Sequence, residues 1–302
     1  MIRRGFLSLA AALALSACAS APQAEAQAPS SGGFVSDRIS VATQGQGPDV
    51  ILIPGLTSSP EIWDTTAAAL DDAHRVHLVH VNGFAGAPAG GNSEGAVSAP
   101  VAEEIARYIR ETGLQRPAVI GHSMGGTIGM MLTARHPDQV GKLMVVDMIP
   151  FMGVMFGGAN ATPQSVAPVA AQIQSAMASA PQGIVSPQTR QTIDNMVRTE
   201  SARPRIIEHA RGSTNRVTAN AYYELVTTDL RPELPRITQP FTVLYVVPPN
   251  APVSAEQYSG YVTASYANAP NAKIVHITES YHFIMIDQFD RFMSEVNTFL
   301  AE

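Results

Sequence analysis

VIGHSMGGTIG, residues 119–129, is a short apolar run that passes through a serine into a glycine-rich segment. It contains the pattern G-x-S-x-G, with Ser123 between Gly121 and Gly125. A strand that enters a helix this abruptly strains the backbone of the residue at the turn, and only small neighbours avoid a clash. The turn would hold the Ser123 hydroxyl at a helix N-terminus, where the N–H of Met124 can face a developing oxyanion. The pattern predicts a nucleophilic serine; the alternative is an ordinary glycine-rich turn.

Apolar runs of strand length recur on both sides of this turn. They occupy residues 49–53, 75–81, 142–146, 241–247 and 273–277. Helical periodicity separates several of them, as at 101–112, where Val101, Ile105, Tyr108 and Ile109 share one face. Parallel strands buried on both faces form continuous apolar runs, and strands that alternate with helices are joined by right-handed crossovers. We therefore expect an α/β fold with a mostly parallel central sheet flanked by helices.

The chain resembles the α/β-hydrolase family from about Asp49 to its C-terminus. The resemblance rests on the serine turn, on the order of strands and helices, and on His282, which follows the last predicted strand. In the family this last loop carries the catalytic histidine, and serine precedes histidine in the chain. The resemblance therefore implies an α/β-hydrolase fold with Ser123 as nucleophile and His282 as general base. It implies no particular substrate, because this fold hosts many activities.

The resemblance also implies a second donor to the oxyanion. In the family, a His-Gly-x sequence follows the strand at this place, and the residue after the glycine donates its N–H. Here Pro54-Gly55-Leu56 follows the strand at 49–53, with proline in place of histidine. Since the donor is a backbone group, Leu56 keeps the role and forms the oxyanion hole with Met124. The alternative is a simple glycine turn.

The acid of the predicted triad departs from the family pattern. The strand at 241–247 is normally followed by a carboxylate, but the next loop offers Asn250 instead. The family also tolerates an acid one strand earlier, where Asp147 stands at the carboxyl end of a predicted strand. We predict Asp147 as the acid; it would otherwise cap a turn, leaving the uncharged Asn250 to hold the imidazole. Glu279 is a weaker candidate, three residues before His282.

Residues 151–235 differ from the rest of the chain because they show no alternating strand pattern. We expect them to form a mainly helical cap inserted into the α/β-hydrolase core, which comprises residues 35–150 and 236–302. The cap begins with an apolar stretch, from which Phe151 and Met155 are predicted to line the substrate pocket, since methionine adapts to varied ligands. The alternative is that these side chains pack the cap onto the sheet.

The composition limits the classes of partner and cofactor that the protein is expected to bind. The 302 residues are 45% hydrophobic with a net charge of −6, and no basic cluster is dense enough for a phosphate backbone, so nucleic acid is not expected. His77 and His80 lie three residues apart on a predicted strand and face opposite sides, so they cannot share a metal. There is no H-E-x-x-H motif, second cysteine or dinucleotide fingerprint, so no metal or organic cofactor is expected.

The first 18 residues resemble the signal of a bacterial lipoprotein. Arginines at positions 3 and 4 precede an apolar run, residues 6–15, that is too short to span a bilayer comfortably. Leu15-Ser16-Ala17-Cys18 follows and carries the only cysteine of the chain. An unpaired cysteine in an exported protein is a reactive liability, which lipidation would remove. We therefore predict a signal peptide with a lipobox at 1–18 and a lipid on Cys18.

Residues 19–34 are rich in Ala, Pro, Gln and Ser and are expected to form a flexible tether. Ala19, rather than an aspartate, follows the cysteine, which in Gram-negative lipoproteins favours the outer membrane. We therefore expect an exported protein, lipid-anchored to the outer membrane and facing the periplasm, that meets the membrane only through its anchor. The alternative is cleavage after Ala26-Gln27-Ala28, which would leave a soluble periplasmic or secreted protein.

The expected activity is hydrolysis of a small-molecule carboxylic ester through an acyl-enzyme intermediate. Two alternatives remain open at this point. The same residues would serve an amidase, a peptidase or a thioesterase. A binding lipoprotein could also keep the fold without turnover, and the missing carboxylate after residue 247 keeps this second alternative open.

Replacing Cys18 tests the lipid anchor. Cys18→Ala should abolish incorporation of labelled palmitate and leave an uncleaved precursor or a differently processed soluble form, because the acceptor thiol is gone. Mass spectrometry of the mature N-terminus provides the second measurement. A wild-type protein that begins near Pro29 and carries no lipid would contradict the lipobox.

Overall fold

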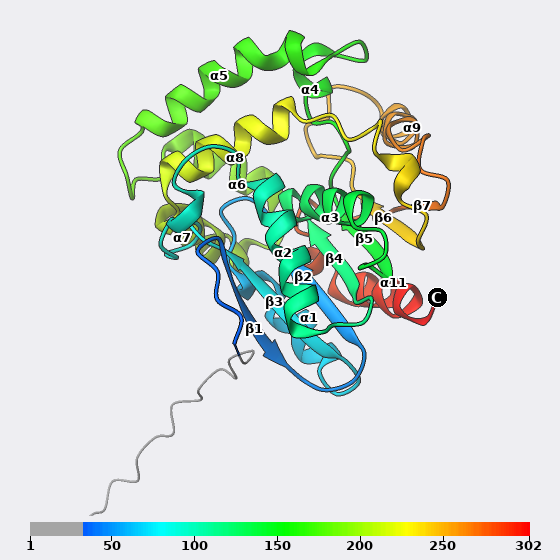
Figure 1. The fold of residues 1–302 in the computed structure, drawn as a ribbon. Helices are drawn as coiled ribbons and strands as arrows, with labels where there is room; N and C mark the ends of the chain where they lie inside the picture. The colour runs from blue at the N-terminus through cyan, green and yellow to red at the C-terminus, as the bar shows by residue number, and fades with distance from the viewer. Residues whose placement is uncertain (1–32) are drawn as a thin grey trace, which may run out of the picture.

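The computed structural model describes residues 33–302, and within them seven strands form one sheet (Figure 1). The strands are β1 (Ile39–Gln44), β2 (Asp49–Ile53), β3 (Arg75–Val81), β4 (Ala118–His122), β5 (Lys142–Val146), β6 (Phe241–Tyr245) and β7 (Ala272–His276). Their order is β1-β3-β2-β4-β5-β6-β7; β1 pairs antiparallel with β3, and all other pairs are parallel. The predicted mostly parallel sheet is confirmed. The predicted signal peptide with Cys18, and the predicted tether up to residue 32, lie outside the described residues.

Helices connect the strands and cover both faces of the sheet. Those of the core are α1 (Asp64–Leu70), α2 (Ser98–Thr112), α3 (Met124–Arg135), α9 (Ala255–Ser265), α10 (Ile284–Asp287) and α11 (Phe289–Ala301). The helix predicted at 101–112 begins three residues earlier, at Ser98, and ends at Gly113, whose φ of 72° suits a glycine. The sequence did not indicate α9, which begins at a capping box made by Ser254 and Gln257.

Alternate residues of each strand enter two different cores. In β2, Ile51 and Ile53 pack into the cluster that contains α2 and α3, whereas Val50 and Leu52 pack into the cluster that contains α1 and α11. This alternation follows from the two-residue period of a strand. All four side chains have no exposed surface, which explains why the run is apolar without interruption.

Between β5 and β6, the described chain forms helices and no strand. They are α4 (Val154–Gly157), α5 (Pro163–Ser179), α6 (Pro187–Met196), α7 (Arg203–Gly212) and α8 (Asn215–Thr227). We call residues 151–235 the inserted helical segment. In Figure 1 its helices lie on one side of the core, with α5 outermost and α8 packed between α5 and the sheet layer.

One carboxylate ties this segment to the core. Glu224 of α8 is 8% exposed, and its two oxygens accept the backbone N–H groups of Val97, Ser98 and Ala99 at 2.8, 2.6 and 2.8 Å. These N–H groups belong to the start of α2, which lacks a side-chain cap of its own. The first N–H groups of a helix have no partner within it, and they favour a negative charge. Glu224 therefore caps α2 from a different part of the chain.

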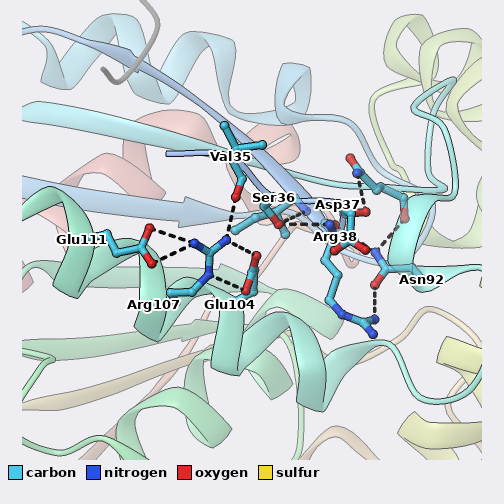
Figure 2. A network of polar contacts seen from close by, with 10 residues as sticks. Val35, Ser36, Asp37, Arg38, Asn92, Glu104, Arg107 and Glu111 are labelled. Carbon is cyan, nitrogen blue, oxygen red and sulfur yellow. Dashed lines mark hydrogen bonds and ion pairs between the residues drawn. The ribbon is translucent and has the colours of Figure 1, made fainter. Parts of the chain in front are cut away.

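A second polar network fixes the chain that leads into β1 (Figure 2). Arg107 of α2 donates to the carbonyl oxygen of Val35 at 2.7 Å and to Glu104 at 2.6 Å. Arg38 and Asn92 exchange hydrogen bonds at 2.9 Å in both directions. The start of β1 is therefore held against α2 and the loop before it. Within residues 33–302, no helix is both long and apolar enough to cross a membrane.

Glu224→Gln tests the tie between α8 and α2. The amide keeps one acceptor oxygen but turns its own N–H₂ toward a backbone donor, so the free energy of unfolding should fall by about 1–3 kcal/mol. Urea denaturation followed by circular dichroism measures the change. Glu208→Gln on α7 is the control, because Glu208 is 58% exposed and its ion pair with Arg211 contributes little. Equal stability of the two variants would show that Glu224 does not act as a cap.

Candidate active site

Ser123 lies in the turn between β4 and α3 with φ 54° and ψ −121°. A non-glycine residue adopts this backbone conformation only where the surroundings enforce it. A Cβ atom at Gly121 would collide with the carbonyl oxygen of Gly125, and one at Gly125 would collide with that of Ile53. The glycines thus allow α3 to begin directly above the end of β2. The strained turn that the G-x-S-x-G pattern predicts is present.

His282 and Asp147 meet at this turn from two other loops. The Nδ1 atom of His282 lies 2.6 Å from one carboxylate oxygen of Asp147. The second oxygen of Asp147 accepts the N–H of Val246 at 3.0 Å, and the N–H of Asp147 donates to Leu244 at 2.8 Å. Asp147 therefore follows β5 directly and is braced against the end of β6. Ser123 and His282 line the same cavity and Asp147 contacts the imidazole, so the three residues that the sequence proposed as a triad lie in one region.

The other two candidates for the acid lie elsewhere. Asn250 is exposed in a turn after β6, and within the described residues it makes no hydrogen bond to His282. Glu279 points outward, with its side chain 72% exposed and paired with Arg198. Of the three candidates, only Asp147 contacts the His282 imidazole within the described residues.

The loop after β2 passes beside Ser123. A Cβ atom at Gly55 would lie 3.1 Å from the Cβ of Ser123, so the two backbones are in close approach. Ser58 donates its N–H to the carbonyl oxygen of Gly55 at 3.1 Å, and the turn between them contains Thr57 at φ 62°. The N–H of Leu56 has no acceptor among residues 33–302. Met124 is the first residue of α3, where N–H groups have no partner within the helix.

His122, the residue before the serine, supports the histidine loop. Its Nε2 atom donates to the backbone carbonyl oxygen of His282 at 3.1 Å, and the two rings lie 4.5 Å apart. Complete burial, together with the neighbouring His282, holds the pKa of His122 well below its ordinary value. The ring is therefore neutral, with its proton on the nitrogen that faces the carbonyl. The sequence did not single out His122, and the available signal was a histidine inside an otherwise apolar strand.

A cavity of about 640 Å³ opens between the core and the inserted helical segment. The core contributes Gly55, Leu56, Thr57, Ser58, His122, Ser123, His282 and Phe283. The inserted segment contributes Met152, Ile173, Ala176, Met177, Ala180, Ser186, Gln188, Thr189, Thr192, Ile193, Met196, Ile206, Ala210, Thr218, Tyr222 and Leu225. None of these residues is Asp, Glu, Lys or Arg. The cavity suits an uncharged group with mixed apolar and hydrogen-bonding surface.

The similarities of this chain to known proteins agree with its fold. The model of the alpha/beta hydrolase fold family matches residues 48–289. The chain belongs to the α/β-hydrolase family. A pimeloyl-(acyl-carrier protein) methyl ester esterase from Aliivibrio fischeri (strain MJ11) is 24% identical over 267 residues, which cover 86% of this chain and 96% of that protein. The corresponding esterase from Vibrio vulnificus (strain YJ016) is 27% identical over 209 residues, 67% of this chain and 76% of the relative.

Solved structures share the fold. A hydrolase from Pseudomonas aeruginosa superposes with a TM-score of 0.71 at 18% identity, covering 87% of this chain and 94% of that one. A thermophilic esterase from Thermogutta terrifontis superposes with a TM-score of 0.70 at 16% identity, covering 87% and 93%. Family membership and the esterase relatives together show that this protein is a hydrolase.

Two residues predicted to line the pocket of this hydrolase do not do so. Phe151 is 1% exposed and packs in a small cluster with Val154 and Val226, with the Arg231 guanidinium 4.8 Å from its ring centre. Met155 is 68% exposed on α4. Pro150 accepts the N–H of Leu230 at 2.9 Å, a contact between residues 80 apart that no local pattern encodes, and next to it Phe151 packs within the inserted segment. The neighbouring Met152 faces the cavity instead.

The two histidines of β3 in this hydrolase have separate partners. His77 contacts the Tyr108 hydroxyl at 2.8 Å and Asp49 at 2.9 Å, and burial lowers its pKa. His80 lies 2.9 Å from the carbonyl oxygen of Phe84, and burial lowers its pKa as well. In the part of the chain that the structure describes, no group of three or more His, Cys, Asp or Glu residues is arranged to hold a metal.

Replacing the acid tests the role of the Asp147–His282 contact. Asp147→Asn should lower kcat for an ester substrate by several orders of magnitude, because an amide neither fixes the imidazole tautomer nor stabilises the imidazolium; the same change in a serine protease, a known example, costs about 10⁴. Steady-state kinetics measure the loss, and thermal denaturation verifies the fold. Asn250→Ala is the control and should leave kcat within about twofold. A greater loss in the control would assign the role to Asn250.

Proposed function

We propose that this hydrolase cleaves carboxylic esters through an acyl-enzyme formed on Ser123. The observation that carries the proposal is the 2.6 Å contact between His282 and Asp147 beside the strained serine turn. A histidine that donates its Nδ1–H to a carboxylate leaves Nε2 free as a base. A serine with such a base beside it is the arrangement that nucleophilic acyl transfer requires.

The reaction would proceed in two displacements. Ser123 attacks the ester carbonyl while His282 takes the hydroxyl proton, and the resulting imidazolium is stabilised by Asp147. The tetrahedral intermediate collapses, the C–O bond to the alcohol breaks, and His282 returns the proton to the leaving alcohol. Water then attacks the acyl-enzyme with His282 again as base, which releases the acid and restores Ser123.

The negative charge of each tetrahedral intermediate needs fixed donors. We assign this role to the N–H groups of Leu56 and Met124. The support is the close approach of Gly55 to Ser123 and the position of Met124 at the start of α3. Backbone donors that are fixed before the reaction stabilise the transition state without reorganisation.

The cavity favours esters that are uncharged on both sides of the scissile bond. No carboxylate, ammonium or guanidinium lines it within the described residues, and a charged group transferred into it would lose hydration without gaining a partner. The curated relatives are named for a methyl ester, which agrees with a small neutral alcohol as leaving group. Amide, peptide and thioester bonds could react at the same residues, and a substrate panel separates them.

We further propose that the mature hydrolase is lipid-anchored through Cys18 to the outer membrane and faces the periplasm. The support is the sequence alone, namely the lipobox-like stretch before the only cysteine and the Ala19 that follows it. The alternative is a soluble exported enzyme. Mass spectrometry of the mature N-terminus distinguishes the two.

Ser123→Ala tests the proposed nucleophile. It should abolish p-nitrophenyl butyrate turnover and labelling by a fluorophosphonate probe, because no other group can form the acyl-enzyme. The melting temperature should change little, since alanine fits where serine does. Ser294→Ala, an exposed position on α11, is the matched control and should keep full labelling. Undiminished labelling of Ser123→Ala would refute the assignment.

The same assay tests the neutral cavity. A p-nitrophenyl ester of a four-carbon acid is compared with its counterpart that ends in a second, ionised carboxylate. The neutral ester should give a kcat/KM at least about tenfold higher, which corresponds to roughly 1.4 kcal/mol of differential stabilisation. Equal values would mean that the acyl group does not enter the cavity.

A further inference from the structure

The main chain around His282 is held at three points. The N–H of Tyr281 donates to the carboxylate of Asp287 at 2.9 Å, and the carbonyl oxygen of His282 accepts from His122 at 3.1 Å. The N–H of Phe283 donates to the carbonyl oxygen of Met196 at 3.3 Å. Two of these points connect the loop to the inserted helical segment, directly or through Asp287.

Asp287 is the centre of this connection. Its carboxylate also accepts the N–H groups of Arg198 and Thr199 at 3.1 and 2.8 Å. One half-buried carboxylate thus gathers three backbone donors, one beside His282 and two from the link between α6 and α7. Hydrogen bonds from backbone N–H groups to a carboxylate are stronger than those between neutral partners.

The link between α6 and α7 begins at the cavity. Met196, two residues before Arg198, lines the cavity together with Ile193, and Phe283 lines it from the other side. Asp287 therefore joins the link that begins at the cavity wall to the loop that carries the proposed base. An error of about 1 Å in the position of a catalytic group can cost about a hundredfold in rate.

We propose that Asp287 is a positioning residue that sets the place of the His282 imidazole by fastening its loop to residues 196–199. The inference rests on the proposed function of His282 as the base. Asp287 does not touch the reacting atoms and acts through the backbone of Tyr281. The ion pair between Arg198 and Glu279, which joins the same two segments, contributes little, because its side chains are 45% and 72% exposed.

Asp287→Asn is the variant that tests the proposal. The amide retains one acceptor oxygen but presents donors to a site that holds three donors, so the loop loses its fixed position. With a neutral p-nitrophenyl ester, kcat should fall about 10- to 100-fold while KM stays within about threefold, because the loss is in the chemical step and not in binding. In proton NMR spectra the wild type should show a downfield resonance of the His282 Nδ1–H, and in the variant this resonance should broaden or move upfield.

Two controls separate positioning from general stability. Asp290→Asn removes an exposed carboxylate three residues further along, and Arg198→Ala removes the exposed ion pair but keeps the backbone N–H that Asp287 accepts. Both should keep kcat within about twofold and retain the downfield resonance. If Asp287→Asn folds poorly, Asp287→Glu replaces it, since it keeps the charge and displaces the oxygens by one methylene; kcat should again fall at constant KM.

Three results would overturn the proposal. The first is an unchanged kcat in Asp287→Asn. The second is a loss of kcat in that variant that only parallels its fraction of unfolded protein, and the third is an equal loss of kcat in Arg198→Ala. A wild-type protein without ester turnover would refute the proposed function instead. In that case the His282 Nδ1–H resonance still tests whether Asp287 positions the loop, because this resonance reports the His282–Asp147 contact without any substrate.

Discussion

The close approach of the α3 N-terminus to the end of β2 is the constraint on which the rest of the site depends. Gly125 lies against the carbonyl oxygen of Ile53 with no room for a side chain, and Gly121 lies against Gly125 in the same way. This contact compresses the turn at Ser123 into its strained conformation and brings the Gly55 loop alongside it. The positions of Ser123, of the α3 N-terminus and of the Gly55 loop therefore all follow from this one close contact.

Ser123, Asp147 and His282 lie near one another because parallel strands present their carboxyl ends at one edge of the sheet. Asp147 and His282 are 135 residues apart in the chain and 2.6 Å apart in space. Their loops are held by main-chain contacts, from Val246 to Asp147 and from His122 to His282. Asp147 contacts the imidazole from the end of β5 and lies against the end of β6, which is the strand after which the family pattern places a carboxylate.

The inserted helical segment supplies most of the cavity wall and is fastened to the core by two carboxylates. Glu224 joins α8 to the start of α2, and Asp287 joins the link after α6 to the His282 loop. Each carboxylate accepts backbone N–H groups, so each contact fixes the main chain and not merely a side chain. The segment that forms most of the cavity wall is thereby coupled to the loop that carries His282, and no charged side chain lines the cavity within the described residues.

The sequence by itself determined the buried parallel strands, the serine turn and the candidate residues at the strand ends. These are encoded locally, since burial on both faces makes a strand apolar throughout, and a tight turn demands glycine. Only the tertiary structure decided between Asp147 and Asn250, turned Met152 rather than Phe151 toward the cavity, and gave His122, Glu224 and Asp287 their partners. Those outcomes depend on contacts between residues far apart in the chain, and no local spacing records which distant carbonyl or N–H group a side chain will meet.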